Sequence, residues 1–230
     1  MTVCVIPARG GSTRIPRKNI RQFCGRPMIA WPIRAAIAAG CFDRIVVSTD
    51  DDEIAEVAAG NGAEVPFRRS ADLSDDHTPT VPVIADAVTR LNIADRTPVC
   101  CLYATSPFVA PGDLRAGLHR LRETGAPFVL SVTTFAFPIQ RALRRDASGA
   151  VEMLDPAMMQ TRSQDLTETW HDAGQFYWGL AQSWTGGQGI FASGAQGLAV
   201  PRHRVQDIDT EEDWHRAEWT MRAMQIEDAP

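Results

Sequence analysis

The first 42 residues of this 230-residue chain contain no aspartate and no glutamate. The same segment contains seven cations and carries a charge of +7, whereas the remainder carries −12, for a net charge of −5. The cations are Arg9, Arg14, Arg17, Lys18, Arg21, Arg26 and Arg34. A negative net charge argues against nucleic acid as a partner, while the local excess of cations predicts either a bound anion or a solvated basic face.

Long apolar runs are also lacking. The longest candidate, residues 28–42, is interrupted by Arg34, whereas a membrane span needs about 20 consecutive apolar residues. A secretory signal consists of a basic segment, an apolar segment and a cleavage site, in that order. The first residues lead directly into the apolar run at residues 3–6 and do not show this order. We therefore expect no membrane partner and a cytoplasmic location.

Cysteine is scarce and lacks the C-x-x-C spacing of many zinc and redox sites. The chain has an odd number of cysteines, most of them in apolar runs, namely Cys4, Cys24, Cys41, Cys100 and Cys101. This pattern predicts reduced side chains that pack in the core, and it argues against a zinc site.

Short apolar runs typical of strands alternate with helical patterns along most of the chain. The strand-like runs span residues 3–6, 45–47, 98–103, 128–132 and 175–178. The helical patterns span residues 28–40, 51–62, 79–93, 111–124 and a final segment from about Glu211. The alternation predicts an α/β fold in which helices cover both faces of a doubly wound, mostly parallel sheet.

Residues 1–230 read as one domain, but the regular alternation lapses between about residues 137 and 172. We expect this segment to form a small lobe that projects from the sheet. Before the final helix, Thr210 and Asp213 have the spacing of a capping box. An apolar stripe should bury one face of that helix, formed by Trp214, Ala217, Met221 and Met224.

A glycine-containing basic loop follows the first predicted strand. It reads IPARGGSTRIPRKN over residues 6–19. In open α/β sheets, ligands bind beyond the carboxyl ends of the strands, and the loop after the first strand is the usual place for phosphate. Gly10 and Gly11 let backbone amides approach phosphate oxygens, and Ser12 adds a hydroxyl group. The loop therefore predicts phosphate binding, although it matches neither the dinucleotide-binding nor the P-loop consensus.

Two aspartates, Asp207 and Asp209, precede the final helix. If the backbone is extended there, both carboxylates face the same side. Mg²⁺ is usually held by carboxylates together with substrate phosphates, so the pair is a candidate magnesium site. The same spacing is common on protein surfaces, so a surface pair that binds no metal is the alternative interpretation.

The amino-terminal loop resembles the signature of the CMP-sugar synthetases, which activate sialic acid and its relatives with CTP. That signature reads IPARGGSKxxPxKN, and every specified position matches except that Thr13 stands where lysine is expected. Further matches follow in the family's order, at residues 25–29, 47–50, 104–107 and 207–210. The resemblance implies a Rossmann-like fold of the nucleotide-diphospho-sugar transferase type and a homodimer formed through the lobe.

The resemblance also implies roles for individual residues in CTP binding. Arg9, Arg14 and Lys18 would neutralise the phosphates during catalysis, with Arg14 supplying the cation that Thr13 lacks. Mg²⁺ would be held by Asp207 and Asp209. The implied nucleotide-binding residues are Ala8, Arg9, Gly10, Gly11, Ser12, Asn19, Arg69 and Asp76.

Arg69 lies in residues 67–78, which are similar to the family's base-recognition loop, although Ser70 replaces the expected proline. An arginine donor suits cytosine, because O2 and N3 of that base are hydrogen-bond acceptors. A charged surface loop remains the alternative interpretation of this segment.

The segments matching the family's sugar site depart from the sialic acid pattern. Residues 101–107 read CLYATSP where those enzymes have LLQPTSP, and residues 171–178 read HDAGQFYW. Both segments resemble the pseudaminic acid branch of the family. The arginine that helps bind the sugar carboxylate is missing, and only Arg162 could replace it. The implied sugar-binding residues are Tyr103, Ala104, Thr105, Arg162, His171 and Gln175, although His171 could equally be a surface or capping residue. We expect Phe176 and Trp178 to lie in the core.

The expected reaction transfers CMP from CTP to the anomeric hydroxyl of an acidic nine-carbon sugar, pseudaminic acid by resemblance, and releases pyrophosphate. Synthetases for sialic or legionaminic acid remain alternatives. The ketodeoxyoctonate cytidylyltransferases share the local sequence at Thr13 and Arg14, but Asn19 and the HDAGQFY segment argue against them. A non-catalytic nucleotide-binding protein would explain the missing lysine, but it would have little reason to retain Asp207 and Asp209.

Overall fold

The computed structural model describes residues 1–227 and contains a six-stranded sheet in the order β10-β6-β9-β5-β1-β4. The strands are β1 (Val3–Pro7), β4 (Arg44–Ser48), β5 (Pro98–Leu102), β6 (Phe128–Thr134), β9 (Trp170–Leu180) and β10 (Gln196–Ala199). β1 is parallel to β4 and β5, and β10 is parallel to β6, whereas β9 is antiparallel to both of its neighbours. The predicted mostly parallel α/β sheet is confirmed.

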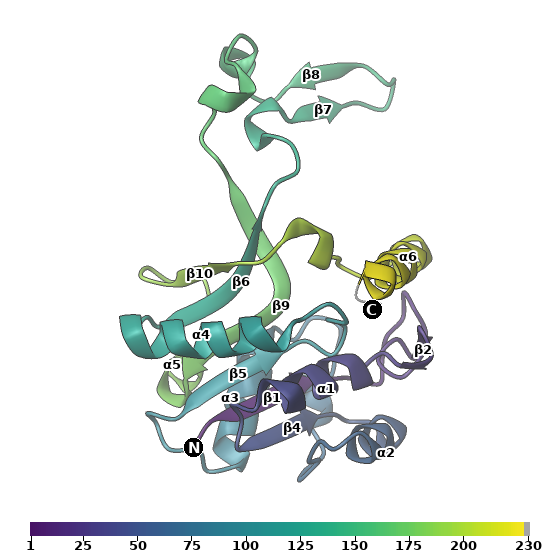
Figure 1. Cartoon of the computed structure of the whole chain (residues 1–230), viewed down its shortest axis with the longest axis vertical. Helices are drawn as coiled ribbons and strands as arrows, with labels where there is room; N and C mark the ends of the chain where they lie inside the picture. The colour runs from purple at the N-terminus through teal and green to yellow at the C-terminus, as the bar shows by residue number, and fades with distance from the viewer. Residues whose placement is uncertain (228–230) are drawn as a thin grey trace.

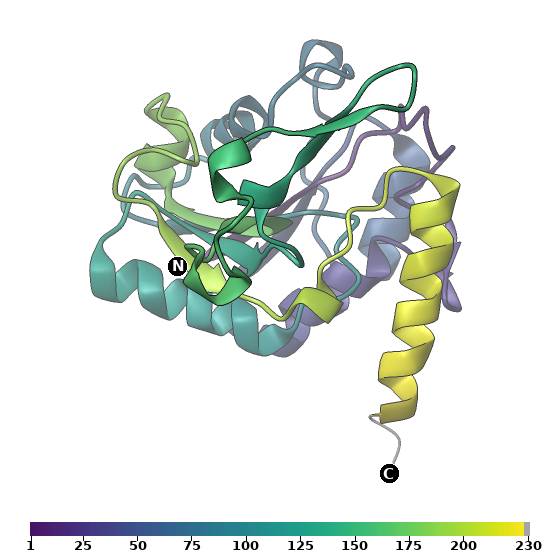
Figure 2. The same ribbon diagram turned by 90° about the horizontal axis from the view of Figure 1, so that it is seen from above.

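Helices cover both faces of this sheet (Figure 1). They are α1 (Ala30–Ala39), α2 (Asp52–Gly60), α3 (Thr80–Arg90), α4 (Pro111–Thr124), α5 (Ala181–Thr185) and α6 (Glu211–Glu227). Figure 2 shows α1 and α4 on one side of the sheet, and their cluster includes Cys4 and Ile6 of β1. The cluster with α3 and α5 includes Val3 and Val5, because successive strand residues face opposite sides.

The final helix joins the amino-terminal part of the chain. Its predicted apolar face is confirmed, because Trp214, Ala217 and Met221 are buried in a cluster with Ile15 and Ile208. A short antiparallel pair, β2 (Gln22–Phe23) and β3 (Arg26–Pro27), lies beside this cluster. The packing brings the segment that carries the two aspartates to the basic loop.

The predicted capping box at the start of α6 is also confirmed. The backbone N–H of Asp213 donates to Oγ1 of Thr210 at 3.2 Å, and the N–H of Thr210 donates to Oδ2 of Asp213 at 2.9 Å. Throughout residues 1–227, none of the helices has both the length and the apolar character required to span a bilayer.

Residues 135–169, called the lobe below, project from the sheet between β6 and β9 (Figure 1). The lobe contains a hairpin of β7 (Leu143–Arg145) and β8 (Val151–Met153) and several 3-10 turns. The turns are η2 (Ile139–Arg141), η3 (Pro156–Met158) and η4 (Ser163–Asp165), and two further ones outside the lobe are η1 (Ala71–Leu73) and η5 (Arg202–Arg204). Because β9 begins at Trp170, His171 belongs to the sheet and not to the projecting part.

Candidate functional site

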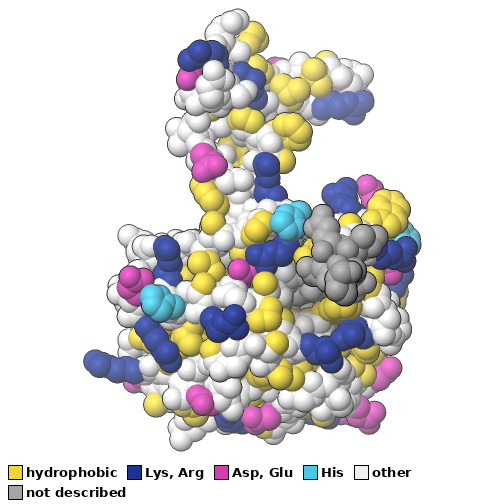
Figure 3. Space-filling view, in the orientation of Figure 1, with side chains coloured by type: hydrophobic (Ala, Val, Ile, Leu, Met, Phe, Trp, Pro, Cys, Tyr) yellow, Lys and Arg dark blue, Asp and Glu magenta, His cyan; other side chains and the backbone are white. Residues whose placement is uncertain are grey.

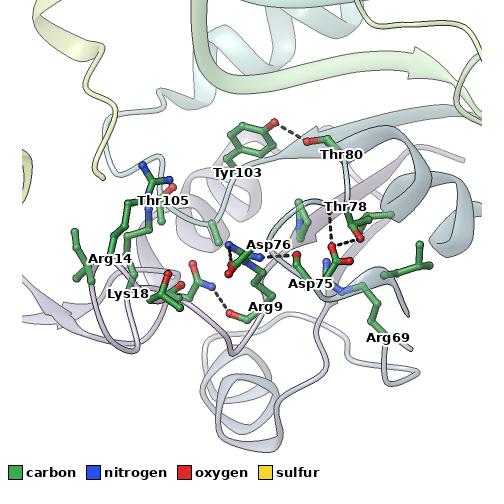
Figure 4. Close-up of a pocket in the computed structure, with 18 residues that line it drawn as sticks. Arg9, Arg14, Lys18, Arg69, Asp75, Asp76, Thr78, Thr80, Tyr103 and Thr105 are labelled. Carbon is green, nitrogen blue, oxygen red and sulfur yellow. Dashed lines mark hydrogen bonds and ion pairs between the residues drawn. The ribbon is translucent and has the colours of Figure 1, made fainter. Parts of the chain in front are cut away.

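A pocket lies beyond the carboxyl ends of β1 and β5 (Figure 4). It is lined by the loop after β1, by the segment between β4 and α3, and by the turn after β5. Residues predicted to bind the phosphates, the base and the sugar therefore line the same cavity. The predicted site residues that line it are Arg9, Ser12, Arg14, Lys18, Asn19, Arg69, Asp76, Tyr103, Ala104 and Thr105.

Arg9 is joined to residues of the facing segment. Its guanidinium lies 2.6 Å from Oδ1 of Asp76 and donates to the backbone carbonyl of Asp75 at 2.5 Å. Asn19 is buried, and its amide donates to the backbone carbonyl of Arg9 at 2.9 Å. Asn19 thus fixes the loop backbone, while Arg9 holds the two sides of the pocket together.

Three of the predicted nucleotide-binding residues do not line the pocket: Ala8, Gly10 and Gly11. The N–H of Ala8 donates to the carbonyl of Ser48, and the N–H of Gly10 donates to Oδ1 of Asp50 at 3.0 Å. These two amides hold the loop against the end of β4, so in this structure they are already engaged.

Arg14 and Lys18 connect the basic loop to the segment before α6. Arg14 Nη1 lies 2.6 Å from Oδ2 of Asp209, and Lys18 Nζ lies 3.2 Å from Oδ1 of the same carboxylate. Lys18 also donates to the backbone carbonyl of Ile208 at 2.6 Å. Thr13 lines the pocket beside Arg14, and the replacement of the family lysine by Arg14 stays a prediction.

Asp207 and Asp209, the expected magnesium ligands, lie on the segment that precedes α6. Loss of solvation by neighbouring protein atoms raises the pKa of Asp207, and the negative charge of Asp209 raises this pKa further. Among the side chains that the structure describes, up to residue 224, no three carboxylate, histidine or cysteine groups gather as a complete metal site. Two adjacent carboxylates that repel each other fit Mg²⁺, because substrate phosphates commonly supply further ligands for that ion.

Arg69 lies on the opposite side of the pocket from Arg14 (Figure 4). Its side chain is only 3% exposed, and burial lowers the pKa of the guanidinium. Nε donates to Oγ of Ser74 at 3.1 Å, and that hydroxyl donates to the carbonyl of Ser70 at 2.9 Å. Serine at position 70 thus supports the loop through its backbone.

Tyr103, which was predicted to bind the sugar, lines the pocket. Its hydroxyl lies 2.7 Å from Oγ1 of Thr80, and burial raises its pKa to about 12. The ring packs edge-on against Tyr177 with a centroid separation of 5.3 Å, and Tyr177 donates to Oδ2 of Asp172 at 2.5 Å. Sequence reasoning missed Thr80 and assigned no role to Tyr177 or Asp172, although both lie in the HDAGQFYW segment.

The other three predicted sugar-binding residues lie outside the pocket of the single chain. Gln175 is buried, and its amide donates to the carbonyl of Arg204 at 2.5 Å, so it anchors the segment that leads to the aspartates. His171 packs against Phe135, with 4.7 Å between ring centroids. Arg162 is in the lobe and forms an ion pair with Asp165 at 2.7 Å.

The expected core positions Phe176 and Trp178 are confirmed, since neither side chain is exposed.

Sequence reasoning also missed Asp75, which shapes the pocket wall. Its Oδ1 accepts hydrogen bonds from the hydroxyl and N–H of Thr78 and from the N–H of His77, and these bonds lower the pKa of Asp75. The Asp-x-x-Thr spacing was the available signal.

Comparison with known sequences gives consistent matches. A sequence model of the family described as Cytidylyltransferase matches residues 3–179. Pseudaminic acid cytidylyltransferase of Campylobacter jejuni subsp. jejuni serotype O:23/36 (strain 81-176) is 42% identical over 213 residues, which is 92% of each chain. CMP-N,N'-diacetyllegionaminic acid synthase of Legionella pneumophila is 36% identical over 69% of this chain and 68% of its own.

Solved structures show the same fold at low sequence identity. A CMP:2-keto-3-deoxy-manno-octonic acid synthetase, determined with CTP, has a TM-score of 0.71 at 16% identity and covers 97% of this chain and 100% of its own. A 4-diphosphocytidyl-2C-methyl-D-erythritol synthase from Anaerococcus prevotii has a TM-score of 0.61 at 13% identity, covering 96% and 98%. These likenesses confirm the predicted Rossmann-like transferase fold. The matched family model and the relatives at 42% identity show that the chain belongs to the cytidylyltransferase family.

Proposed function

We propose that this protein transfers CMP from CTP to the anomeric hydroxyl of pseudaminic acid, an acidic nine-carbon sugar, and releases pyrophosphate. The observation that carries the proposal is the 42% identity, over 92% of the chain, to two Campylobacter jejuni proteins named pseudaminic acid cytidylyltransferase. The pocket supports it, because cations for a triphosphate and the Tyr103 ring line the same cavity.

The proposed reaction is an in-line attack of the sugar hydroxyl on the α-phosphorus of CTP. Catalysis of this kind rests mainly on positioning and on neutralising charge. Arg9, Arg14 and Lys18 would bind the phosphate oxygens, and Arg9 would exchange its bond to Asp76 for one to phosphate. Tyr103, whose pKa is raised to about 12, stays protonated at neutral pH and positions the sugar without acting as a base.

Asp207 and Asp209 would hold Mg²⁺ in this proposal. When bound, the ion would stabilise the charge that develops on the phosphates and help to lower the pKa of the attacking hydroxyl. The ion pairs of Arg14 and Lys18 with Asp209 hold the carboxylate beside the pocket that these two cations line. The same residues thereby set the distance between the phosphate loop and the aspartates.

A related sugar, legionaminic acid, is the second candidate. A CMP-N,N'-diacetyllegionaminic acid synthase of Campylobacter jejuni is 49% identical, although only over 88 residues, or 38% of this chain. The shorter match gives this candidate less support than pseudaminic acid.

The substrate assignment is tested by pyrophosphate release with CTP and a panel of pseudaminic, legionaminic, neuraminic and ketodeoxyoctonic acids. We expect kcat/KM to be highest for pseudaminic acid, by at least about tenfold over neuraminic acid. Pseudaminic acid carries an additional acylated amine and a terminal methyl, which suit the aromatic wall at Tyr103. A higher kcat/KM for neuraminic or ketodeoxyoctonic acid would refute pseudaminic acid as the substrate. Absence of pyrophosphate release with all four acids would refute the proposed cytidylyl transfer.

The metal assignment predicts that Asp209→Asn lowers kcat by at least about tenfold, or roughly 1.4 kcal/mol in activation free energy. A matched control is Asp213→Asn, which disturbs the same segment through the capping box but should leave kcat within about twofold. Steady-state kinetics with and without EDTA provide the measurement. Full activity in EDTA, or equal losses in the two variants, would contradict the metal site.

We also propose that the protein is a homodimer formed through the lobe. Large apolar side chains are exposed along the lobe (Figure 3), including Phe137 at 83% and Leu154 at 63%. Soluble monomers rarely expose concentrated apolar surface, and such surface commonly marks an interface between chains.

The dimer proposal predicts a mass in solution of twice 25.2 kDa by light scattering. Leu154→Glu should shift the mass towards that of the monomer, because it places a charge in the apolar contact. Phe191→Glu is the control, since Phe191 is 70% exposed but lies outside the lobe. A wild-type monomer at micromolar concentration, or dissociation by Phe191→Glu alone, would overturn the proposal.

A further inference from the structure

Asp50 contacts two parts of the site that are distant in the sequence. It follows β4, as the last residue of the sequence VSTD at residues 47–50, and does not line the pocket. Its Oδ1 accepts the N–H of Gly10 at 3.0 Å and lies 3.8 Å from Nη2 of Arg69. Gly10 belongs to the basic loop, and Arg69 belongs to the segment predicted to bind the base. One carboxylate oxygen therefore faces both segments.

A neighbouring carboxylate, that of Asp51, crowds the backbone at position 10. A Cβ atom at this position would lie 2.8 Å from Oδ2 of Asp51. Asp51 anchors the same loop in a different way, because it pairs with the Arg17 guanidinium at 2.5 Å and caps α2 through the N–H of Ile54. Asp50 and Asp51 thus both contact the basic loop, but of the two only Asp50 is in ion-pair range of Arg69.

The contact with Arg69 is electrostatic. Among the described side chains, those of residues 1–224, Asp50 supplies the only carboxylate within 4.0 Å of this buried guanidinium. At 3.8 Å the pair is too long for a hydrogen bond. Nε is engaged by Ser74, whereas neither Nη atom donates a hydrogen bond within the described residues. Asp50 therefore balances the charge of Arg69 and leaves its Nη hydrogens available to a ligand.

We propose that Asp50 is a positioning residue that couples the phosphate loop to Arg69 and thereby sets the preference for cytosine. The inference rests on the proposed use of CTP. Cytosine presents O2 and N3 as acceptors to the Arg69 donors, whereas uracil presents an N3–H that would oppose them. Discrimination between these bases needs Arg69 to be fixed relative to the phosphates, and Asp50 supplies that link.

The test compares Asp50→Asn, Asp50→Ala and Asp51→Asn by pyrophosphate release with CTP and UTP. Asn keeps an oxygen for the Gly10 N–H but removes the charge that faces Arg69. We expect Asp50→Asn to lower the CTP/UTP ratio of kcat/KM at least about tenfold. Asp50→Ala should in addition raise KM for CTP, because the loop loses its anchor. Asp51→Asn loosens the loop through Arg17, so it should weaken both nucleotides equally and preserve the ratio.

A second readout does not require the sugar or turnover. The increase in Tm caused by CTP should exceed the increase caused by UTP in the wild type, and this difference should shrink in Asp50→Asn. If Asp50→Ala fails to fold, Asp50→Asn decides the outcome, because it conserves shape.

An unchanged CTP/UTP ratio in Asp50→Asn would overturn the inference while leaving the proposed function intact. An equal loss of the ratio in Asp51→Asn would also overturn it, because general loosening of the loop would then explain the effect. A wild-type enzyme that uses CTP and UTP equally would instead contradict the proposed base specificity, and the inference with it.

Discussion

The amino-terminal loop is strongly basic, and the fold must hold it with carboxylates that come from later parts of the chain. The pairs are Arg9 with Asp76, Arg17 with Asp51, Arg14 and Lys18 with Asp209, and Arg21 with Glu211. Most of these side chains are partly exposed, so each pair contributes little to stability by itself. Together they bring the start of the chain, the segment before α3 and the segment before α6 to one pocket.

The same cations are the proposed partners of the CTP phosphates, which means that substrate and protein carboxylates compete for them. In this structure Asp76 forms an ion pair with Arg9, and Asp209 forms ion pairs with Arg14 and Lys18. In the structure without substrate, the carboxylates hold these cations at the pocket. The raised pKa of Asp207 reflects reduced solvation and repulsion from Asp209, and a bound cation would relieve that repulsion.

Much of the fold could be predicted because it follows local periodicity and capping, as the confirmed Thr210–Asp213 box shows. The antiparallel direction of β9 could not be predicted, because an apolar run does not indicate whether the strand pairs in parallel or antiparallel with its neighbours in the sheet. Gln175 was predicted to contact sugar, which stays a prediction, and no local pattern indicated that its side-chain N–H donates to the distant carbonyl of Arg204. The role of Asp50 depends on contacts 40 and 19 residues away in the sequence, which no local pattern encodes.

Calorimetric titration with CTP and with cytidine, in the presence of Mg²⁺, tests most directly whether the basic loop is a phosphate site. If Arg9, Arg14 and Lys18 bind the triphosphate, CTP should bind at least about 100-fold more tightly than cytidine, or roughly 2.8 kcal/mol. The difference should shrink as salt is raised, because ionic contacts at a partly exposed site are screened. Equal affinities for CTP and cytidine would contradict the assignment of this loop.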